Sequence, residues 1–272
     1  MAIGHLARSA LTLPAIGRHR ELIGMMVRRD LAQRYRATLM GLLWSLLHPL
    51  LTLLLYTYVF SVVLKVKFGA DASTASFALY LFCGMLPWLA FSEGLNRSAG
   101  VVVENVNLVK KVIFPLEILP LNLALAAVVT QAVGMAILLP AIMLRGITPT
   151  WLWLLVPLLI LPQLLWTVGL GWWVSSLGVY VRDVGQAIGL VLMAWMFLTP
   201  IYYPESMIPA EYRWLGLLNP MAVLIGAHRD LLLDGRLPAI WPLLGQTAAG
   251  AFVFLLGFAW FAKTKKGFAD VI

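Results

Sequence analysis

Long apolar stretches alternate with short polar segments along the whole chain. A helix needs about 20 apolar residues to cross the hydrocarbon layer of a bilayer, and six stretches reach or approach that length. The pattern therefore predicts one all-α integral membrane domain over residues 1–272, with six transmembrane helices and no separate soluble domain. The predicted spans cover residues 39–63, 77–97, 116–144, 151–180, 184–201 and 240–262.

The segment before the first span, residues 18–36, combines closely spaced arginines with apolar side chains. Segments of this composition lie in the headgroup layer of a membrane, so we expect an interfacial helix there. Its arginines are candidate contacts for lipid headgroups, and for two of them, Arg28 and Arg29, binding of a carrier lipid is the alternative. The candidate headgroup residues are Arg28, Arg29, Arg34 and Arg36.

Residues 202–237 form neither a clear loop nor a clear span. Pro204, Pro209 and Pro220 divide this region into apolar pieces that are too short to cross a bilayer and too apolar for open water. Irregular backbone is tolerated at membrane depth only where protein or water satisfies its polar groups. We therefore expect short external re-entrant helices before the last span.

Charge fixes the expected orientation. The six spans place fourteen of the 20 Lys and Arg residues on the side of the termini and six on the other. Because basic loops stay in the cytoplasm, both termini are predicted to be cytoplasmic. Glu93 and Arg97, at the inner end of the second span, have the four-residue spacing of a helical ion pair.

The composition excludes several functional classes. Hydrophobic residues make up 61% of the chain and charged residues only 12%, whereas soluble proteins carry roughly 25% charged residues. The net charge of +8 comes from residues beside the spans, so it indicates lipid contact and no nucleic-acid partner. The single cysteine, Cys83, permits no internal disulfide.

No catalytic motif is present in the sequence. His-Glu-x-x-His, paired cysteines and Gly-x-Ser-x-Gly are all missing, so we expect no catalytic residue and no metal site. The segment 257–264 comes one residue short of a phosphate-binding loop, because Ala262 stands where the second glycine belongs. No cofactor is therefore expected in this chain.

Three groups of residues, in a fixed order along the chain, resemble a known family: the polysaccharide-exporting permeases of the ABC-2 class of ABC transporters, which export capsule, O-antigen or teichoic acid. The short chain looks most like a capsule exporter. The first group is Gly41, Trp44, Pro49, Tyr56 and Phe60; the second is Gly84–Trp88 with Phe91, Asn105, Leu108, Lys111 and Phe114–Pro115; the third is Tyr180, Arg182–Asp183, Trp195–Tyr202, Asn219–Pro220 and Phe268–Ile272.

The resemblance implies a homodimer in the bacterial inner membrane that forms one pore. Two copies of a separate ATPase subunit would bind ATP and magnesium, and the substrate would be a lipid-linked polysaccharide. Periplasmic or outer-membrane export proteins are further candidate partners. Two alternatives stay open: an ABC-2 permease for drugs or small molecules, and a membrane enzyme of lipid or glycan metabolism.

Aromatic residues are the candidates for contact with the substrate. The C–H face of a sugar stacks on an aromatic ring without requiring a fixed pattern of hydroxyls, which suits a sliding polymer. The alternative is an interfacial belt, because Trp and Tyr favour headgroup depth. The candidates are Tyr56, Phe60, Trp195, Phe197, Tyr202 and Tyr203.

The segment between the second and third spans is the candidate contact with the ATPase. Residues 103–115 mix apolar and polar side chains, as expected of a short helix that docks in a groove of a partner. Phe114–Pro115 would end that helix sharply, and the family resemblance also places a coupling helix here. The candidates are Asn105, Leu108, Lys110, Lys111 and Phe114, with Arg182 and Asp183 as a second contact. For Lys110 and Lys111, contact with the carrier phosphate or a role in insertion alone are alternatives.

Overall fold

The computed structural model describes residues 19–35, 43–63, 65, 73–110 and 114–272, and over these residues it contains helices and no strand. The helices before the middle of the chain are α2 (Arg20–Tyr35), α3 (Leu43–Thr57), the π-helical η1 (Tyr58–Val63), α4 (Thr74–Ser98), α5 (Val101–Glu104), α6 (Val106–Val109) and α7 (Ile118–Leu144). The later ones are η2 (Trp151–Leu159), α8 (Ile160–Tyr180), α9 (Val184–Leu198), η3 (Glu205–Met207), η4 (Ala210–Tyr212), α10 (Arg213–Leu218), α11 (Pro220–Leu232), α12 (Ile240–Thr264), η5 (Lys265–Gly267) and α13 (Phe268–Val271).

Four helical segments of the described chain are long and apolar enough to cross a membrane: Thr74–Ser98, Ile118–Leu144, Trp151–Tyr180 and Ile240–Val271. They coincide with four of the six predicted spans. The first predicted span corresponds to α3 with the adjoining π-helix η1, which together cover Leu43–Val63, and the fifth corresponds to α9, which has 15 residues. A helix of that length rises about 22 Å, short of the roughly 30 Å hydrocarbon layer. The count of six crossings therefore stays a prediction.

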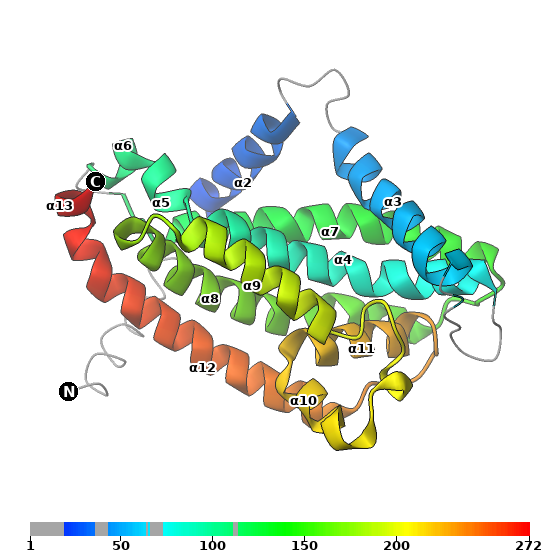
Figure 1. Ribbon diagram of the computed structural model, residues 1–272. Coiled ribbons are helices and arrows are strands. Elements are labelled where there is room, and N and C mark those ends of the chain that lie inside the picture. Colours follow the sequence, from blue (N-terminus) through cyan, green and yellow to red (C-terminus); the bar gives the residue numbers. More distant parts are fainter. Residues whose placement is uncertain (1–18, 36–42, 64, 66–72, 111–113) are drawn as a thin grey trace.

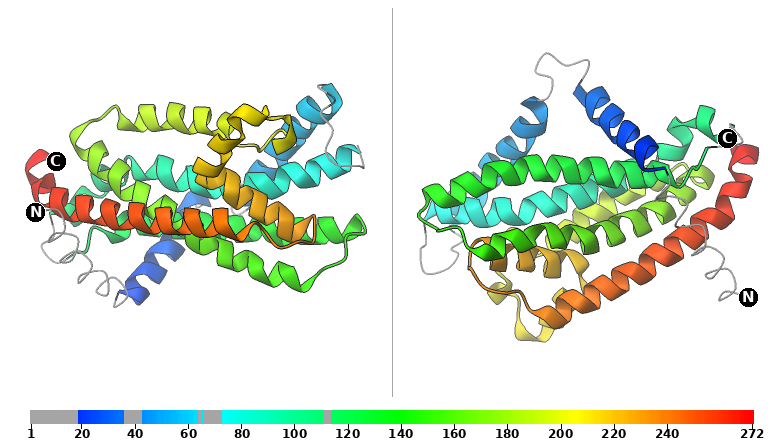
Figure 2. Two further views of the ribbon diagram at one scale, coloured as in Figure 1. Left: turned by 90° about the horizontal axis from the view of Figure 1, so that it is seen from below. Right: turned by 180° about the vertical axis from the view of Figure 1, so that it is seen from behind.

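The long helices pack around α4. This helix contacts α3, α7, α8, α9 and α11, and its residues 81–88 are all buried. It continues without interruption through Pro87. On one side of the bundle α12 runs along α8, and α2 projects from the side of α7 (Figures 1 and 2).

Small residues let α8 and α12 approach closely. A Cβ atom on Gly169 would lie 2.7 Å from the backbone nitrogen of Phe254, and one on Gly257 would collide with the backbone of Gly169. Helices in a membrane associate through close van der Waals contacts of this kind, because the surrounding lipid is as apolar as the helices and the hydrophobic effect does not drive them together. A larger side chain at either glycine would force the two helices apart.

One end of the bundle, which we call the α6 end, gathers segments that are far apart in the sequence. Here α5, α6 and α13 lie together at the left of Figure 1. Phe268 of α13 is fully buried, and its ring contacts Phe261 and Tyr180. Lys265 forms an ion pair with Glu117 at the start of α7. The last helix therefore extends beyond the predicted end at residue 262, and the chain after it packs into the core.

Two further segments differ from the expectation. The predicted short helix over residues 103–115 is two four-residue helices, α5 and α6, separated at Asn105 with φ −111° and ψ 35°. The first part of the predicted span 151–180 is the 3-10 helix η2, which contains Pro157; proline removes a backbone donor and clashes with an α-helical carbonyl. The region 202–237 holds the predicted short helices, of which α11 is the longest and is largely buried.

Candidate functional site

Four of the six predicted aromatic residues form one cluster. Tyr56 of α3 and Phe60 of η1 meet Tyr202, about 140 residues later in the chain, with ring centroids 4.8 Å and 5.0 Å away. The rings of Phe60 and Tyr202 are stacked, with an interplanar angle of 8°. Phe197, at the end of α9, lies 6.0 Å from Tyr202. We call Tyr56, Phe60, Phe197 and Tyr202 the aromatic cluster.

The four rings of the aromatic cluster differ in exposure. Tyr202 is only 2% exposed, and its hydroxyl donates a hydrogen bond to Met196 Sδ at 3.0 Å. Phe197 is 56% exposed, whereas Tyr56 and Phe60 are half-buried. In the single chain, Tyr202 therefore supports the cluster from inside, and Phe197 presents its ring to the surroundings.

Trp195 and Tyr203 lie outside this group of rings, and the hydroxyl of Tyr203 donates to the carbonyl oxygen of Phe197 at 2.8 Å. The indole Nε1–H of Trp195 donates to Asn219 Oδ1 at 3.0 Å, and its ring lies 5.2 Å from that of Phe91. Asn219 caps α11, since its Oδ1 also accepts from the backbone N–H groups of Met221 and Ala222, the usual role of an N-cap side chain. Trp195 thus helps to fix the start of α11, outside the aromatic cluster.

Arg229 holds the segment that carries the aromatic cluster. Its side chain is in α11 and is 5% exposed. The guanidinium donates to the carbonyl oxygens of Pro200 at 2.6 Å and Ile201 at 3.0 Å, and to that of Tyr80 at 3.3 Å. It also lies 3.6 Å from the centroid of the Tyr80 ring, in the geometry of a cation–π interaction. Arg229 therefore joins α11 and α4 to the residues immediately before Tyr202.

This role of Arg229 was not expected from the sequence, where the charge count included it among the six basic residues on the side opposite the termini. The available signal was the start of a helix at Asn219–Pro220, because Asn at the cap and Pro at the first helical position are typical of a helix beginning. Extending that helix through the apolar residues to Leu232 places Arg229 within it.

The candidate coupling residues lie at the α6 end. Leu108 and Phe114 pack against a core cluster that also contains Trp172 and Phe268. Asn105 donates through its side-chain amide to Val101 O at 2.8 Å. Lys110 is exposed, as are Arg182 and Asp183 in the turn between α8 and α9, while Lys111 lies outside the described residues. The structure thus brings the two predicted contact segments to one end of the bundle.

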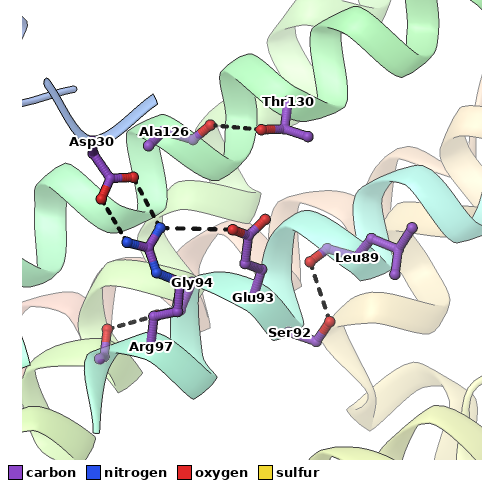
Figure 3. Close-up of polar contacts among 9 residues, drawn as sticks. Asp30, Leu89, Ser92, Glu93, Gly94, Arg97, Ala126 and Thr130 are labelled. Carbon is purple, nitrogen blue, oxygen red and sulfur yellow. Dashed lines mark hydrogen bonds and ion pairs between the residues drawn. The ribbon is translucent and has the colours of Figure 1, made fainter. Parts of the chain in front are cut away.

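An ion pair attaches α2, the helix that the sequence predicts to be interfacial, to α4. The guanidinium of Arg97 donates to both carboxylate oxygens of Asp30, at 2.9 Å and 2.5 Å, and lies 3.7 Å from the carboxylate of Glu93. Figure 3 shows the Arg97 head group facing both carboxylates. The predicted Glu93–Arg97 pair is confirmed, but the closer partner comes from α2, 67 residues away in the sequence.

The predicted headgroup arginines are distributed along α2. Arg28 and Arg29 are exposed, and Arg34 belongs to the helix, whereas Arg36 lies outside the described residues. Because Asp30 is bonded to Arg97 of the bundle, it determines which side of α2 faces the bundle. The two exposed arginines keep their positive charges at the surface.

Known proteins resemble this chain over nearly its whole length. It is 31% identical over 256 residues to an O-antigen export system permease protein RfbA of Myxococcus xanthus, covering 93% of this chain and 96% of the relative. A protein of the same name from Klebsiella pneumoniae is 28% identical over 255 residues, covering 93% and 95%. The polysialic acid transport protein KpsM of Escherichia coli is 22% identical over 208 residues, covering 76% and 79%.

The ABC-2 type transporter family matches residues 21–233 of the chain. This range begins in α2 and ends directly after α11, so it includes the aromatic cluster, Arg229 and both segments predicted to contact the ATPase, but not α13. With most of the chain matched, and with the resemblance that its residue groups suggested, the protein belongs to the ABC-2 type transporter family.

Proposed function

We propose that this chain is the membrane-spanning permease subunit of an ATP-driven exporter that moves a lipid-linked polysaccharide across the bacterial inner membrane. The observation that carries the proposal is the match over more than nine-tenths of the chain to O-antigen export permeases. The greater identity and coverage of these relatives, compared with the polysialic acid transport protein, favour an O-antigen-type chain over the capsule suggested by chain length.

The proposed assembly is a homodimer that binds two copies of a separate ATPase, which holds ATP and magnesium. The α6 end is the proposed docking face. It presents Lys110, Arg182 and Asp183 at the surface, while Leu108 and Phe114 anchor the same segment in the core. A segment with a packed anchor transmits a rigid-body movement, because it cannot absorb that movement by local bending.

The proposed topology has six crossings, with both termini and the α6 end in the cytoplasm. Glu211, exposed in η4, would then face the opposite side. A small tag inserted after Glu211 should be labelled from outside intact spheroplasts, and a reporter fused after Ile272 should be active only in the cytoplasm. Protection of the Glu211 tag would refute this topology.

The proposed path for the polymer follows the aromatic cluster. Exposed and half-buried rings from α3, η1 and the end of α9 offer stacking surfaces without directional hydrogen bonds. A permease for small molecules is the second candidate, and an apolar substrate could use the same rings.

Deletion of the gene separates these candidates. Loss of surface polysaccharide, restored by the wild-type gene and accompanied by glycan accumulation inside the cell, is the expected result. Normal surface polysaccharide combined with new drug sensitivity would overturn the proposal in favour of small-molecule export.

A further inference from the structure

A polar cavity lies between α2 and the bundle, with a volume of about 230 Å³. A cavity of about 10–15 Å³ is enough to hold one buried water molecule, so this cavity can accept a larger polar group. Polar residues of three helices line it beside the Asp30–Arg97 pair: Arg29 and Gln33 of α2, Glu104 of α5 with the adjacent Asn105, and Asn122 of α7.

The charges of this cavity are balanced, and two of them have no close partner. Arg97 is engaged by Asp30 and Glu93, as Figure 3 shows. In the described part of the chain, no ion pair within 4 Å involves Arg29 or Glu104. The cavity thus offers one cation and one anion, together with the side-chain amides. A ligand with a single sign of charge would satisfy only one of the two.

Asn122 gives an independent indication of a ligand. Its side chain lines the cavity and is 6% exposed. Its Oδ1 atom is buried and accepts no hydrogen bond from any described residue. Buried acceptors in folded proteins almost always have a donor. Because this oxygen has almost no surface open to the cavity, the Asn122 side chain must turn toward an occupant that carries N–H or O–H groups.

The position of the cavity in the fold indicates where such a ligand would come from. The cavity lies where the apolar helix α4 ends at Arg97 and where α7 passes through its first turns at Asn122. The ends of spanning helices mark the boundary between hydrocarbon and water, and α2 has the composition of a helix that lies in the headgroup layer. A lipid headgroup is therefore the polar group nearest to this cavity.

From these observations we infer that the cavity binds the headgroup of a zwitterionic phospholipid with a primary ammonium, the chemistry of phosphatidylethanolamine. The phosphate lies at Arg29 and Gln33, and the ammonium donates to Glu104 and to Asn122 Oδ1. Phosphatidylcholine has the same charges but no N–H donor, and phosphatidylglycerol lacks the cation. The inference does not depend on which substrate the permease exports.

The test uses the full chain, purified and stripped of lipid, with the three phospholipids carrying identical acyl chains. Native mass spectrometry measures retained lipid, and thermal unfolding in mixed micelles measures stabilisation. Phosphatidylethanolamine should bind about tenfold more tightly than phosphatidylcholine, because one charge-assisted hydrogen bond accounts for about that factor. Phosphatidylglycerol should also bind more weakly.

Variants assign the preference to this cavity. Glu104→Gln should remove the preference for phosphatidylethanolamine over phosphatidylcholine, and Arg29→Gln should weaken both. Arg28→Gln is the matched control, because Arg28 is an exposed neighbour on α2 that does not line the cavity. Asn122→Leu should also abolish the preference; if that variant does not fold, the two surface variants still decide the matter.

Three results would overturn the inference. Equal binding of phosphatidylethanolamine and phosphatidylcholine would show that no N–H donor is recognised in the cavity. Tightest binding of phosphatidylglycerol would indicate attraction to the arginines alone. An equal effect of Arg28→Gln and Arg29→Gln would place the lipid elsewhere on α2.

Discussion

Replacement of Arg229 by methionine should strongly destabilise the region that carries the aromatic cluster. Methionine retains an apolar stem but cannot donate to the carbonyl oxygens of Pro200 and Ile201, which now accept at 2.6 Å and 3.0 Å. Hydrogen bonds to charged groups contribute about 1.5–3 kcal/mol each. Because removal of a buried guanidinium also relieves its desolvation penalty, we expect a net loss of about 2–4 kcal/mol.

Gly84 provides a second perturbation of the same contact. A Cβ atom on Gly84 would lie 2.6 Å from Arg229 Nη2 and 3.0 Å from Ile225 Cγ2, so Gly84→Ala must displace the guanidinium. Overpacking of this kind costs about 1–3 kcal/mol. In the Arg229→Met background the carbonyl contacts are already lost, so the same alanine should cost less, with a coupling of about 1 kcal/mol or more.

The assay is thermal unfolding of the purified permease in one detergent, for the two single variants, the double variant and a control. A loss of about 2–4 kcal/mol corresponds to a drop of roughly 10 °C in a chain of this size. Gly226→Ala, in the same helix α11, is the control, since no atom lies within 4 Å of its added Cβ. An unchanged unfolding temperature of Arg229→Met, or additive effects in the double variant, would refute the proposed role of Arg229.

Three other predictions follow from the site. Tyr56→Ala and Phe60→Ala should lower surface polysaccharide at unchanged protein level, by analogy with stacking on aromatic rings, which is worth about 1–3 kcal/mol for a nucleic-acid base; normal export in both would leave these residues in a membrane belt. Lys110→Glu, at an exposed residue, and Lys111→Glu should weaken co-purification of the ATPase while the permease remains in the membrane, and unchanged capture would remove this segment from the interface. The purified chain should hydrolyse no ATP above a mock preparation, because Ala262 replaces the glycine that a phosphate loop requires; hydrolysis that persists after removal of every other polypeptide would contradict this.

The long spans could be predicted from the sequence because hydropathy is a local property. Each of the four long apolar helices carries its own signal over 25 residues or more. The shorter helices α3 and α9 have the same apolar character, but composition alone does not determine where a helix ends. The chain from Trp151 onward is apolar enough for a membrane span. Its first part, Trp151–Leu159, nevertheless forms a 3-10 helix that contains Pro157 and not an α-helix.

The contacts that position the site could not be predicted in the same way, because they join distant residues. Asp30 and Arg97 are separated by 67 residues, and the sequence offered Glu93 as the nearer partner. Arg229 looked like an external charge until α11 buried it against α4 and the end of α9. By contrast, the candidate aromatics Tyr56, Phe60 and Tyr202 were identified by type and approximate depth, and the fold then brought them together.

Transport in a reconstituted system tests the central claim most directly. The permease and its ATPase would be placed together in lipid vesicles that contain a lipid-linked O-antigen chain, with the nucleotide sites facing outward. Addition of ATP should move the glycan from the outer face to the lumen, measured as loss of binding by an external lectin, and Leu108→Asp should prevent the movement. Hydrolysis of ATP by the intact complex while the glycan stays at the outer face would contradict the assignment of this chain as a polysaccharide permease.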